Sequence, residues 1–232
     1  MPSLFNYQPP QQPWLDIVFA DKDLLVLNKP SGLLSVSGRG AHLADSLLSR
    51  AQQQYGFAQI INRLDLATSG LVVIALRRKA ERHLKQQFAE RKVLKRYLAV
   101  VWGQVSHALG TVDLPLAAAG NDPPHNHVCF THGKAALTHY RLLQQLSDRA
   151  LIELTPITGR SHQLRVHMQS LGWPIVGDHF YASEPAIAAA PRLLLHAAHL
   201  QLQQPYSGEQ LTFSANSDFV SASGKLMADF NE

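Results

Sequence analysis

The sequence has only one cysteine, Cys129, and no long hydrophobic run. A single cysteine excludes an internal disulfide and any zinc site built on two or more cysteines. The longest apolar run, residues 71–76, has the length of a strand and falls well short of the ~20 residues that a membrane-spanning helix needs. The first residues lack the charged start and the apolar core of a secretory signal. We therefore expect a cytoplasmic protein that does not associate with membranes.

Two nucleotide-binding patterns are also absent, because the sequence contains neither GxGxxG nor GxxxxGK. No cofactor is therefore predicted. The 232 residues are 46% hydrophobic, which is enough for a sizeable core and excludes general disorder. Lys and Arg total 21 against 17 for Asp and Glu, a net charge of +4. This modest excess permits a polyanionic partner without requiring one.

The apolar pattern predicts strands and helices that alternate irregularly. Residues 71–76 form a continuous apolar run typical of a buried strand, and residues 79–90 have helical spacing because Ala80, Leu84 and Phe88 recur every four positions. Residues 117–134 are rich in turn-forming types and are expected to form a loop. Further strands are predicted at 16–20, 24–28, 97–102, 136–146, 151–156, 193–202 and 210–213, and further helices at 44–54, ending at Gly56, and at 162–171, capped by Ser161.

These elements favour an α+β fold with a central, mostly antiparallel mixed sheet flanked by helices and loops. Residues 1–14 are rich in Pro and Gln, so we expect an extended, weakly ordered arm there. Residues 15–216 are expected to form one domain. Residues 217–232 would be a C-terminal tail whose last dozen residues form a short helix or fray.

Asp65 lies in a short polar turn directly before the buried strand at 71–76. Such a loop can present a carboxylate at a rigid sheet edge, where functional groups are often found. The other reading is an Asp that caps its own turn and has no chemical role. The local sequence alone favours this second reading.

Basic residues are concentrated between positions 77 and 96, which hold nine of the chain's 21 Lys and Arg residues. On the predicted helix, Arg78, Arg82 and Lys85 can line up along one side. This concentration suits contacts with the phosphates of a nucleic acid. A solvated helix face explains it equally well.

Residues 158–167, Thr-Gly-Arg-Ser-His-Gln-Leu-Arg-Val-His, place a glycine turn between a predicted strand and a predicted helix. The exposed amides at the start of such a helix form a ready anion site. Arg165 lies in the first turn and a half of the helix and could face the same pocket. Alternatively, Arg160 and Arg165 form ordinary surface ion pairs, which contribute little to stability.

Taken together, these segments resemble the RluA family of pseudouridine synthases. Residues 63–70, Arg-Leu-Asp-Leu-Ala-Thr-Ser-Gly, resemble the first family signature. Residues 95–100 resemble the second, which carries a Tyr, and residues 154–167 resemble the third. Residues 172–181 and 193–197 continue the match in the family's order and spacing. The resemblance covers residues 15 to about 215 and implies that this domain has the pseudouridine synthase catalytic fold.

The resemblance implies that the chain isomerises uridine to pseudouridine in structured RNA, with no cofactor and no metal. It makes Asp65 the essential carboxylate and Tyr97 the active-site aromatic residue that packs on the uracil. It also makes Arg165 the cation that pairs with Asp65. A buried carboxylate resists ionisation, and a fixed cation beside it reverses that effect. We therefore expect an Asp65–Arg165 pair that keeps Asp65 ionised at neutral pH.

The target uridine must be extruded from its stack, and Arg63 is expected to take the place of the departed base. Asn62 occupies the position where the family usually has His. Asn can still form hydrogen bonds but does not titrate near neutrality, so the difference is expected to affect only the positioning of the loop or of the flipped base. The residues predicted to contact RNA are Asn62, Arg63, Arg77, Arg78, Arg82, Lys85, Arg91, Lys95, Arg160 and His162.

The opening Asn-Tyr-x-Pro-Pro-x-x-Pro-Trp resembles family members that act on both tRNA and large-subunit rRNA. The substrates implied are the first uridine of the anticodon loop of some tRNAs and a uridine in a large-subunit rRNA hairpin. We expect a monomer with no obligate protein partner.

Three other functions are open from the sequence. A glycosidase normally needs two carboxylates at a set separation, and only Asp65 lies in a recognisable motif. A metal-dependent nuclease could use His125 and His127, although a solvated loop is the favoured interpretation of this segment. A non-catalytic RNA-binding or RNA-folding protein is the main alternative, and the presence of Asp65, Tyr97 and Arg165 argues against it.

Overall fold

The computed structural model describes residues 7–120 and 125–227. The chain folds as two compact units, one formed by residues up to 95 with 197–215, the other by 96–196 with residues from 216 onward. The strands β5 (Leu94–Trp102) and β11 (Leu195–Gln203) each continue from one unit into the other. The single domain predicted over residues 15–216 stays a prediction.

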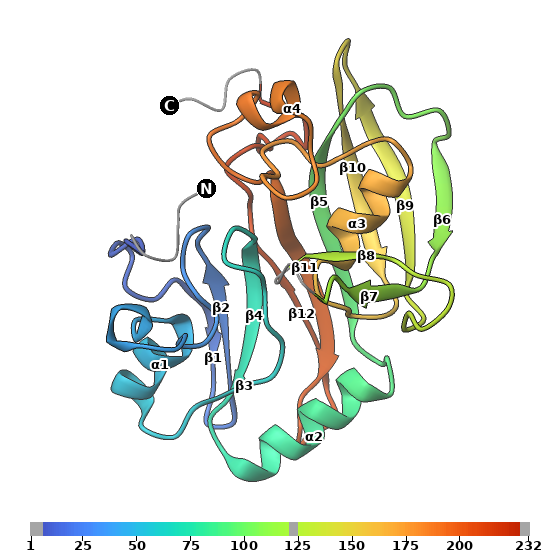
Figure 1. The fold of residues 1–232 in the computed structure, drawn as a ribbon. Coiled ribbons are helices and arrows are strands. Elements are labelled where there is room, and N and C mark those ends of the chain that lie inside the picture. The colour runs from blue at the N-terminus through green and yellow to red at the C-terminus, as the bar shows by residue number, and fades with distance from the viewer. Residues whose placement is uncertain (1–6, 121–124, 228–232) are drawn as a thin grey trace. The chain divides into compact units, whose positions relative to one another are not determined.

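The sheet of the first unit begins with an antiparallel hairpin of β1 (Ile17–Ala20) and β2 (Leu24–Lys29). Next to β2 lies β4 (Ser69–Ala75), which also pairs with the short β3 (Gln59–Ile60) and neighbours β11 (Figure 1). The strand β12 (Gln210–Ser214) pairs with β11. Every residue of β4 is buried, as its continuous apolar run predicts.

The helices of this unit are η2 (Ala41–Leu43, a 3-10 turn), α1 (Leu47–Tyr55) and α2 (Arg78–Ala89). A reciprocal capping box between Ser46 and Ser49 starts α1, and Gly56, with φ 70°, ends it. The buried face of α2, formed by Ala80 and Leu84, packs on the apolar side chains of β2, β4 and β11. Both predicted helices are confirmed.

The second unit contains β5, β10 (Arg149–Pro156), β9 (Leu137–Gln145) and β6 (Leu109–Asp113), joined in that order by antiparallel pairing (Figure 1). The helix α3 (Gln163–Ser170) lies against β9, where the side chains of Gln163 and His167 bond to Thr138. A short helix, α4 (Glu184–Ala188), follows. Antiparallel pairing with few helices confirms the predicted α+β class. No helix in the described part of the chain is both long and apolar enough to cross a bilayer.

Two local predictions are wrong. The expected loop at 117–134 contains a hairpin of β7 (Leu116–Ala118) and β8 (Asn126–Val128), and its residues 121–124 lie outside the described part of the chain. Ser161 does not cap α3. The helix begins after His162, whose φ is 53°. The Gln163 side chain instead takes the amide hydrogen of Arg160, at 2.9 Å.

The structure describes the two ends of the chain only in part. Weak order was expected over residues 1–14, yet Tyr7, Pro10 and Trp14 are hydrogen-bonded to residues far away in the sequence. Residues 1–6 lie outside the described range. The tail contains no helix as far as residue 227, and Val220 there bridges to Leu226. Residues 228–232 are likewise outside it.

Candidate active site

The loop that carries Asp65, residues 61–68, connects β3 with β4 in the first unit. The main-chain carbonyl of Asp65 accepts the Thr68 amide at 3.1 Å, which closes a tight turn. At the start of β4, just after the loop, Gly70 has φ 112°, and a Cβ there would lie 2.4 Å from the backbone of Ala197 in β11. Glycine is therefore required for the loop to enter the sheet at this point.

Asn62 anchors the start of this loop to β4. Its Oδ1 accepts the Val73 amide at 2.8 Å, and its Nδ2 lies 3.4 Å from the Leu71 carbonyl. The Asn62 side chain therefore bonds to backbone groups of β4 that a neighbouring strand would otherwise bond to. Arg63, the next residue, is exposed, while Asp65 is half-buried. The structure thus places the Asn62 side chain against the backbone and Arg63 toward solvent.

A second segment, residues 29–35, holds the middle of the Asp65 loop. Lys29 is fully buried, and its Nζ donates to the carbonyls of Leu33 at 2.7 Å, Pro30 at 3.0 Å and Leu66 at 3.2 Å. The Ser35 hydroxyl donates to the Leu64 carbonyl at 2.6 Å and accepts the Leu64 amide at 3.0 Å.

Two further hydrogen bonds join the same segments, from the Gly32 amide to the Leu66 carbonyl (2.9 Å) and from the Ser31 hydroxyl to the Ala67 carbonyl (2.8 Å). The residues on both sides of Asp65 are therefore fixed through their backbones. A loop held in this way can keep one side chain in a set direction. Lys29 and Ser35 could not be found from the sequence, since neither stands in a pattern that marks a loop contact.

Arg165 lies in α3 of the second unit and is almost completely buried. Its Nε and Nη2 donate to the two carboxylate oxygens of Asp178, at 2.8 and 2.6 Å, and the exposed fractions of the two side chains are 5% and 0%. The guanidinium carbon also lies 4.9 Å from the ring centre of Phe180 and 5.1 Å from that of Tyr181. A bidentate pair and two rings fix the plane of this guanidinium.

Asp178 is a functional candidate that no sequence pattern marks on its own. It belongs to the segment 172–181, which resembles the family as a whole. Besides the two bonds from Arg165, it accepts the Phe180 amide at 3.0 Å. An acidic residue in a Gly-Asp-His turn is ordinary in sequence terms, so only the fold shows that its partner is Arg165.

His162 is 7% exposed, and its Nδ1 lies 2.7 Å from the Tyr181 hydroxyl. That hydroxyl accepts the Asn126 amide of β8 at 2.9 Å, so its own hydrogen can go to Nδ1. His162 and Arg165 thus meet on the same aromatic ring. Arg160 is exposed, with its Nε donating to the Ala135 carbonyl at 3.1 Å. The Gln163 amide, the first of the helix, donates to the Arg160 carbonyl at 3.1 Å, so the expected anion site at this helix start loses one donor.

Tyr97 lies on β5, opposite Leu154 of β10, and is half-buried. Lys95 is on the same strand, and burial lowers the pKa of its ammonium group. Tyr97 and Arg165 belong to the second unit, whereas Asp65 and the basic helix belong to the first.

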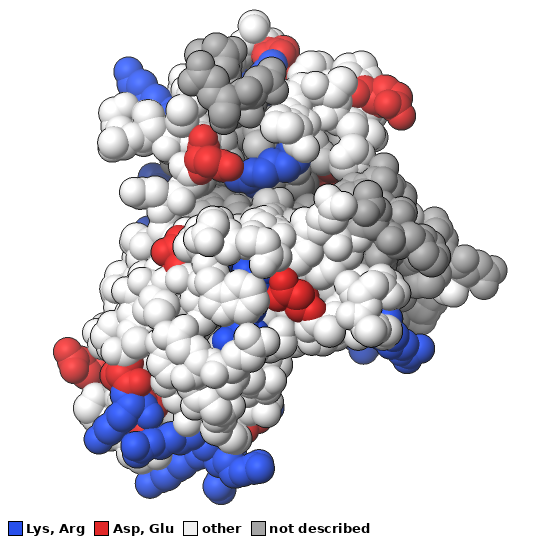
Figure 2. Space-filling model, turned by 90° about the vertical axis from the view of Figure 1, so that its left-hand side faces the viewer, with Lys and Arg blue, Asp and Glu red and all other residues white. Residues whose placement is uncertain are grey.

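The basic residues around α2 are mostly exposed. Figure 2 shows Lys and Arg side chains gathered at the lower end of the face it displays, the end at which Figure 1 places α2. Lys85 pairs with Glu81 at 2.6 Å, Arg77 lies 3.8 Å from Asp23, and Arg78 packs over Phe57. Since α2 follows the C-terminal end of β4 and the Asp65 loop precedes its N-terminal end, about 20 Å of strand separates them.

The described residues contain no group of three or more His, Cys, Asp or Glu side chains placed to hold a metal ion. His125 instead packs edge-on against Phe180 and Tyr181, with ring centres 4.7 and 5.9 Å apart.

Comparison with known proteins identifies the family. Residues 23–170 match the family model described as RNA pseudouridylate synthase. The dual-specificity RNA pseudouridine synthase RluA of Escherichia coli K12 is 53% identical over 215 residues, covering 92% of this chain and 98% of that protein. Its namesake from Haemophilus influenzae is 46% identical over 218 residues, covering 94% and 100%.

A solved structure leads to the same family. Human RNA Pseudouridylate Synthase Domain Containing 1 superposes with a TM-score of 0.74 at 28% identity, covering 89% of this chain and 84% of that one. The chain therefore belongs to the RNA pseudouridylate synthase family and, within it, to the RluA group.

Proposed function

We propose that this enzyme modifies uridines in stem-loops of both tRNA and large-subunit rRNA, with Asp65 as its essential carboxylate. As a member of its family it isomerises uridine to pseudouridine in RNA. The dual specificity in the names of its bacterial relatives supports two kinds of substrate. The expected targets are the first uridine of some anticodon loops and one rRNA hairpin uridine. We expect the enzyme to act in the cytoplasm as a monomer.

The observation that carries the proposal is the rigid Asp65 loop. Leu64, Leu66 and Ala67, around Asp65, are tied by hydrogen bonds to residues 29–35. A turn whose Asp served only as a cap would not need so many anchors on either side of it. The same eight residues, 63–70, carry the family signature.

The reaction breaks the bond from C1′ of the ribose to N1 of the uracil and forms a bond from C1′ to C5. The proton on C5 leaves, and N1 gains one, so the product has the mass of the substrate. In every version of this chemistry the Asp65 carboxylate must be ionised and close to the ribose. Tyr97 is proposed to pack on the uracil, where its hydroxyl could take part in removing the C5 proton.

Arg165 is proposed as the cation that keeps Asp65 ionised, and Asp178 as the residue that orients Arg165. Asp178 uses the Nε–Nη2 edge of the guanidinium. A guanidinium has five donors in a fixed plane, so holding one edge also determines where the other donors point. His162 is proposed to act through Tyr181 rather than by touching RNA, because little of its side chain reaches the surface.

RNA binding is proposed to use the Asp65 loop, the basic segment 77–96 and Arg160. Arg63 is exposed near Asp65 and would replace the extruded base. Asn62 would fix the start of the loop through its hydrogen bond with the Val73 amide. The exposed cations of the 77–96 segment would bind phosphates about 20 Å from Asp65, in a part of the RNA away from the modified loop. Arg160, which is exposed, would add a contact from the second unit.

The test uses the purified chain with two transcripts, a tRNA anticodon stem-loop and a large-subunit rRNA hairpin, each labelled with tritium at uracil C5. We expect tritium release from both, and pseudouridine at a single position in each by carbodiimide primer extension. Binding without tritium release would favour the non-catalytic RNA-binding protein. Release of free uracil would favour a glycosidase.

A further inference from the structure

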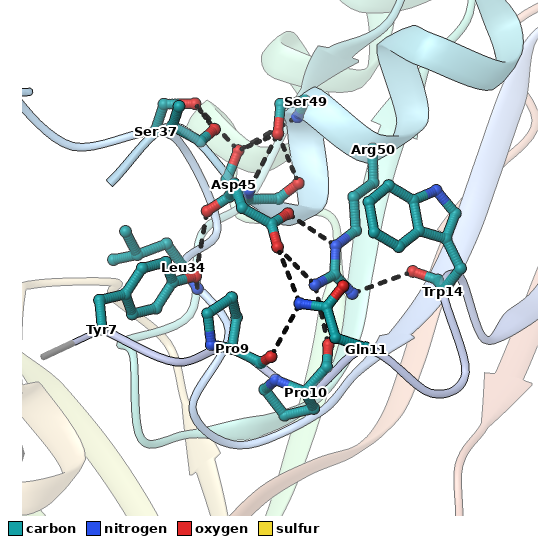
Figure 3. Close-up of polar contacts among 12 residues, drawn as sticks. Tyr7, Pro9, Pro10, Gln11, Trp14, Leu34, Ser37, Asp45, Ser49 and Arg50 are labelled. Atoms are coloured by element: carbon teal, nitrogen blue, oxygen red, sulfur yellow. Dashed lines mark hydrogen bonds and ion pairs between the residues drawn. The ribbon is translucent and has the colours of Figure 1, made fainter. Parts of the chain in front are cut away.

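The N-terminal segment Tyr7–Trp14, here called the strap, is fastened to the start of α1 (Figure 3). Arg50 of α1 is completely buried, and its Nη2 and Nη1 donate to the carbonyls of Pro10 at 2.8 Å and Trp14 at 3.2 Å. Its guanidinium also lies 4.3 Å from the centre of the Trp14 ring. Three strap contacts thus converge on one side chain.

Asp45 completes this connection. It accepts Nε and Nη2 of Arg50, each at 2.7 Å, and it also lies 3.4 Å from the Gln11 side chain (Figure 3). The hydrogen bonds from Arg50 lower the pKa of the Asp45 carboxyl, so this carboxylate stays ionised well into acid. A buried Arg between a carboxylate and two carbonyls fixes the strap at two points along its length.

Tyr7 links the strap to the segment that holds the catalytic loop. Its hydroxyl donates to the Asp45 carbonyl at 3.0 Å and accepts the Leu34 amide at 2.9 Å. The next residue, Ser35, makes both hydrogen bonds to Leu64, and Leu64 immediately precedes Asp65. A continuous path therefore runs from Tyr7 to Asp65 through hydrogen bonds and two steps along the chain, from Leu34 to Ser35 and from Leu64 to Asp65.

The strap also passes close to this segment at Gly32. A Cβ at Gly32 would lie 3.7 Å from Cδ of Pro10, and the Gly32 amide donates to the Leu66 carbonyl on the other side of Asp65. Residues 31–35 are therefore enclosed between the strap and the catalytic loop. Movement of the strap would remove support at Leu34 and Gly32, and Gly32 and Ser35 in turn bond to the loop on either side of Asp65.

We propose that the strap is a positioning device for the catalytic loop, and that Tyr7 is a positioning residue for the isomerisation. The inference rests on the proposed role of Asp65. It gives a function to the Asn-Tyr-x-Pro-Pro-x-x-Pro-Trp opening, which the reaction chemistry does not use. Tyr7, Pro10 and Trp14 of that pattern are the residues that make the contacts.

The test is Tyr7→Phe in the full chain, which keeps the ring and removes the hydroxyl. At saturating enzyme, the single-turnover rate of pseudouridine formation should fall about 10-fold, because small displacements of a reacting group have large effects on rate. KM for RNA should change less than about twofold, since the strap touches no proposed RNA contact. A 10-fold loss corresponds to about 1.4 kcal/mol.

Amide hydrogen exchange provides a readout that does not depend on catalysis. The amides of Leu64, Thr68 and Gly32 are bonded within or to the catalytic loop, and Tyr7→Phe should make them exchange faster. Tyr55→Phe is the matched control, because Tyr55 ends α1 in the same unit and its hydroxyl bonds to no other described residue. It should leave both the rate and the exchange unchanged.

A double-mutant cycle with Ser35→Ala tests the path itself. If Tyr7 acts through residues 34 and 35, the double variant should turn over no more slowly than Ser35→Ala alone. Additive losses, unchanged exchange at the three amides, or a Tyr7→Phe rate within twofold of the Tyr55→Phe rate would each overturn the inference. If the wild-type chain made no pseudouridine, the proposed function would fail, while the exchange data would still report on the strap.

Discussion

Removing the carboxylate of Asp178 is the perturbation whose effect the structure defines best. Asp178→Asn preserves the size of the side chain but turns one acceptor into a donor that faces the donors of Arg165. The two bonds at stake measure 2.8 and 2.6 Å, and both side chains are buried. Removing one partner of a buried ion pair costs about 3–5 kcal/mol. We expect about 3 kcal/mol, because the amide oxygen can still accept one hydrogen bond.

In a chain of this length, 1 kcal/mol corresponds to about 2–4 °C in melting temperature. Asp178→Asn should therefore lower the melting temperature by about 6–12 °C, as followed by circular dichroism. Assayed well below that melting temperature, the folded variant should also turn over at least about 10-fold more slowly, because Arg165 loses its fixed orientation.

Asp148→Asn is the matched control. Asp148 pairs with Arg149 at 2.8 Å in the same unit, but the exposed fractions of those side chains are 42% and 22%. An exposed pair of this kind contributes at most about 1 kcal/mol. If Asp178→Asn melted within about 2 °C of Asp148→Asn and kept full turnover, the role assigned to the Arg165–Asp178 pair would be refuted.

Three further predictions follow from the same structure. Burial lowers the pKa of His167, which bonds to Thr138 and the Leu114 carbonyl, so its neutral form stabilises the fold. That stability is present above about pH 6.5 and is lost as the pH falls toward the lowered pKa, so the urea midpoint should drop less steeply in His167→Gln than in wild type. Neutralising Arg78 and Arg82 to Gln should lower the slope of log affinity against log salt by about 1.5–2, and an unchanged slope would remove α2 from the RNA interface. Tyr97→Phe should slow tritium release from uracil C5, and full release would exclude the hydroxyl from proton removal.

The elements with strong local signals could be predicted from the sequence. The strand β4 is a continuous apolar run, and α2 has helical spacing with charges between its buried positions. Neither element therefore needs contacts with distant residues to be predicted. The hairpin of β7 and β8 could not be predicted, because each strand is three residues long and lies among turn-forming residues. The start of α3 was misplaced because the residue before the helix is His162 in a left-handed conformation, which the sequence does not mark, and no side chain caps the helix.

The residues that hold the site depend on contacts across the chain. Lys29 bonds to a carbonyl 37 positions away, and Arg165 to a carboxylate 13 positions away. No local pattern encodes either contact. The local sequence around Asp65 predicts only a simple turn residue, and the resemblance of residues 63–70 to a family signature is what indicates a chemical role. The structure adds that the turn is closed by its main-chain carbonyl.

The most direct measurement of the central claim is single-turnover pseudouridine formation by Asp65→Asn on the anticodon stem-loop, with circular dichroism to verify the fold. The account predicts intact RNA binding and a rate at least about 1,000-fold below wild type, because the essential carboxylate is gone. A folded Asp65→Asn protein that converts uridine within tenfold of the wild-type rate would contradict it.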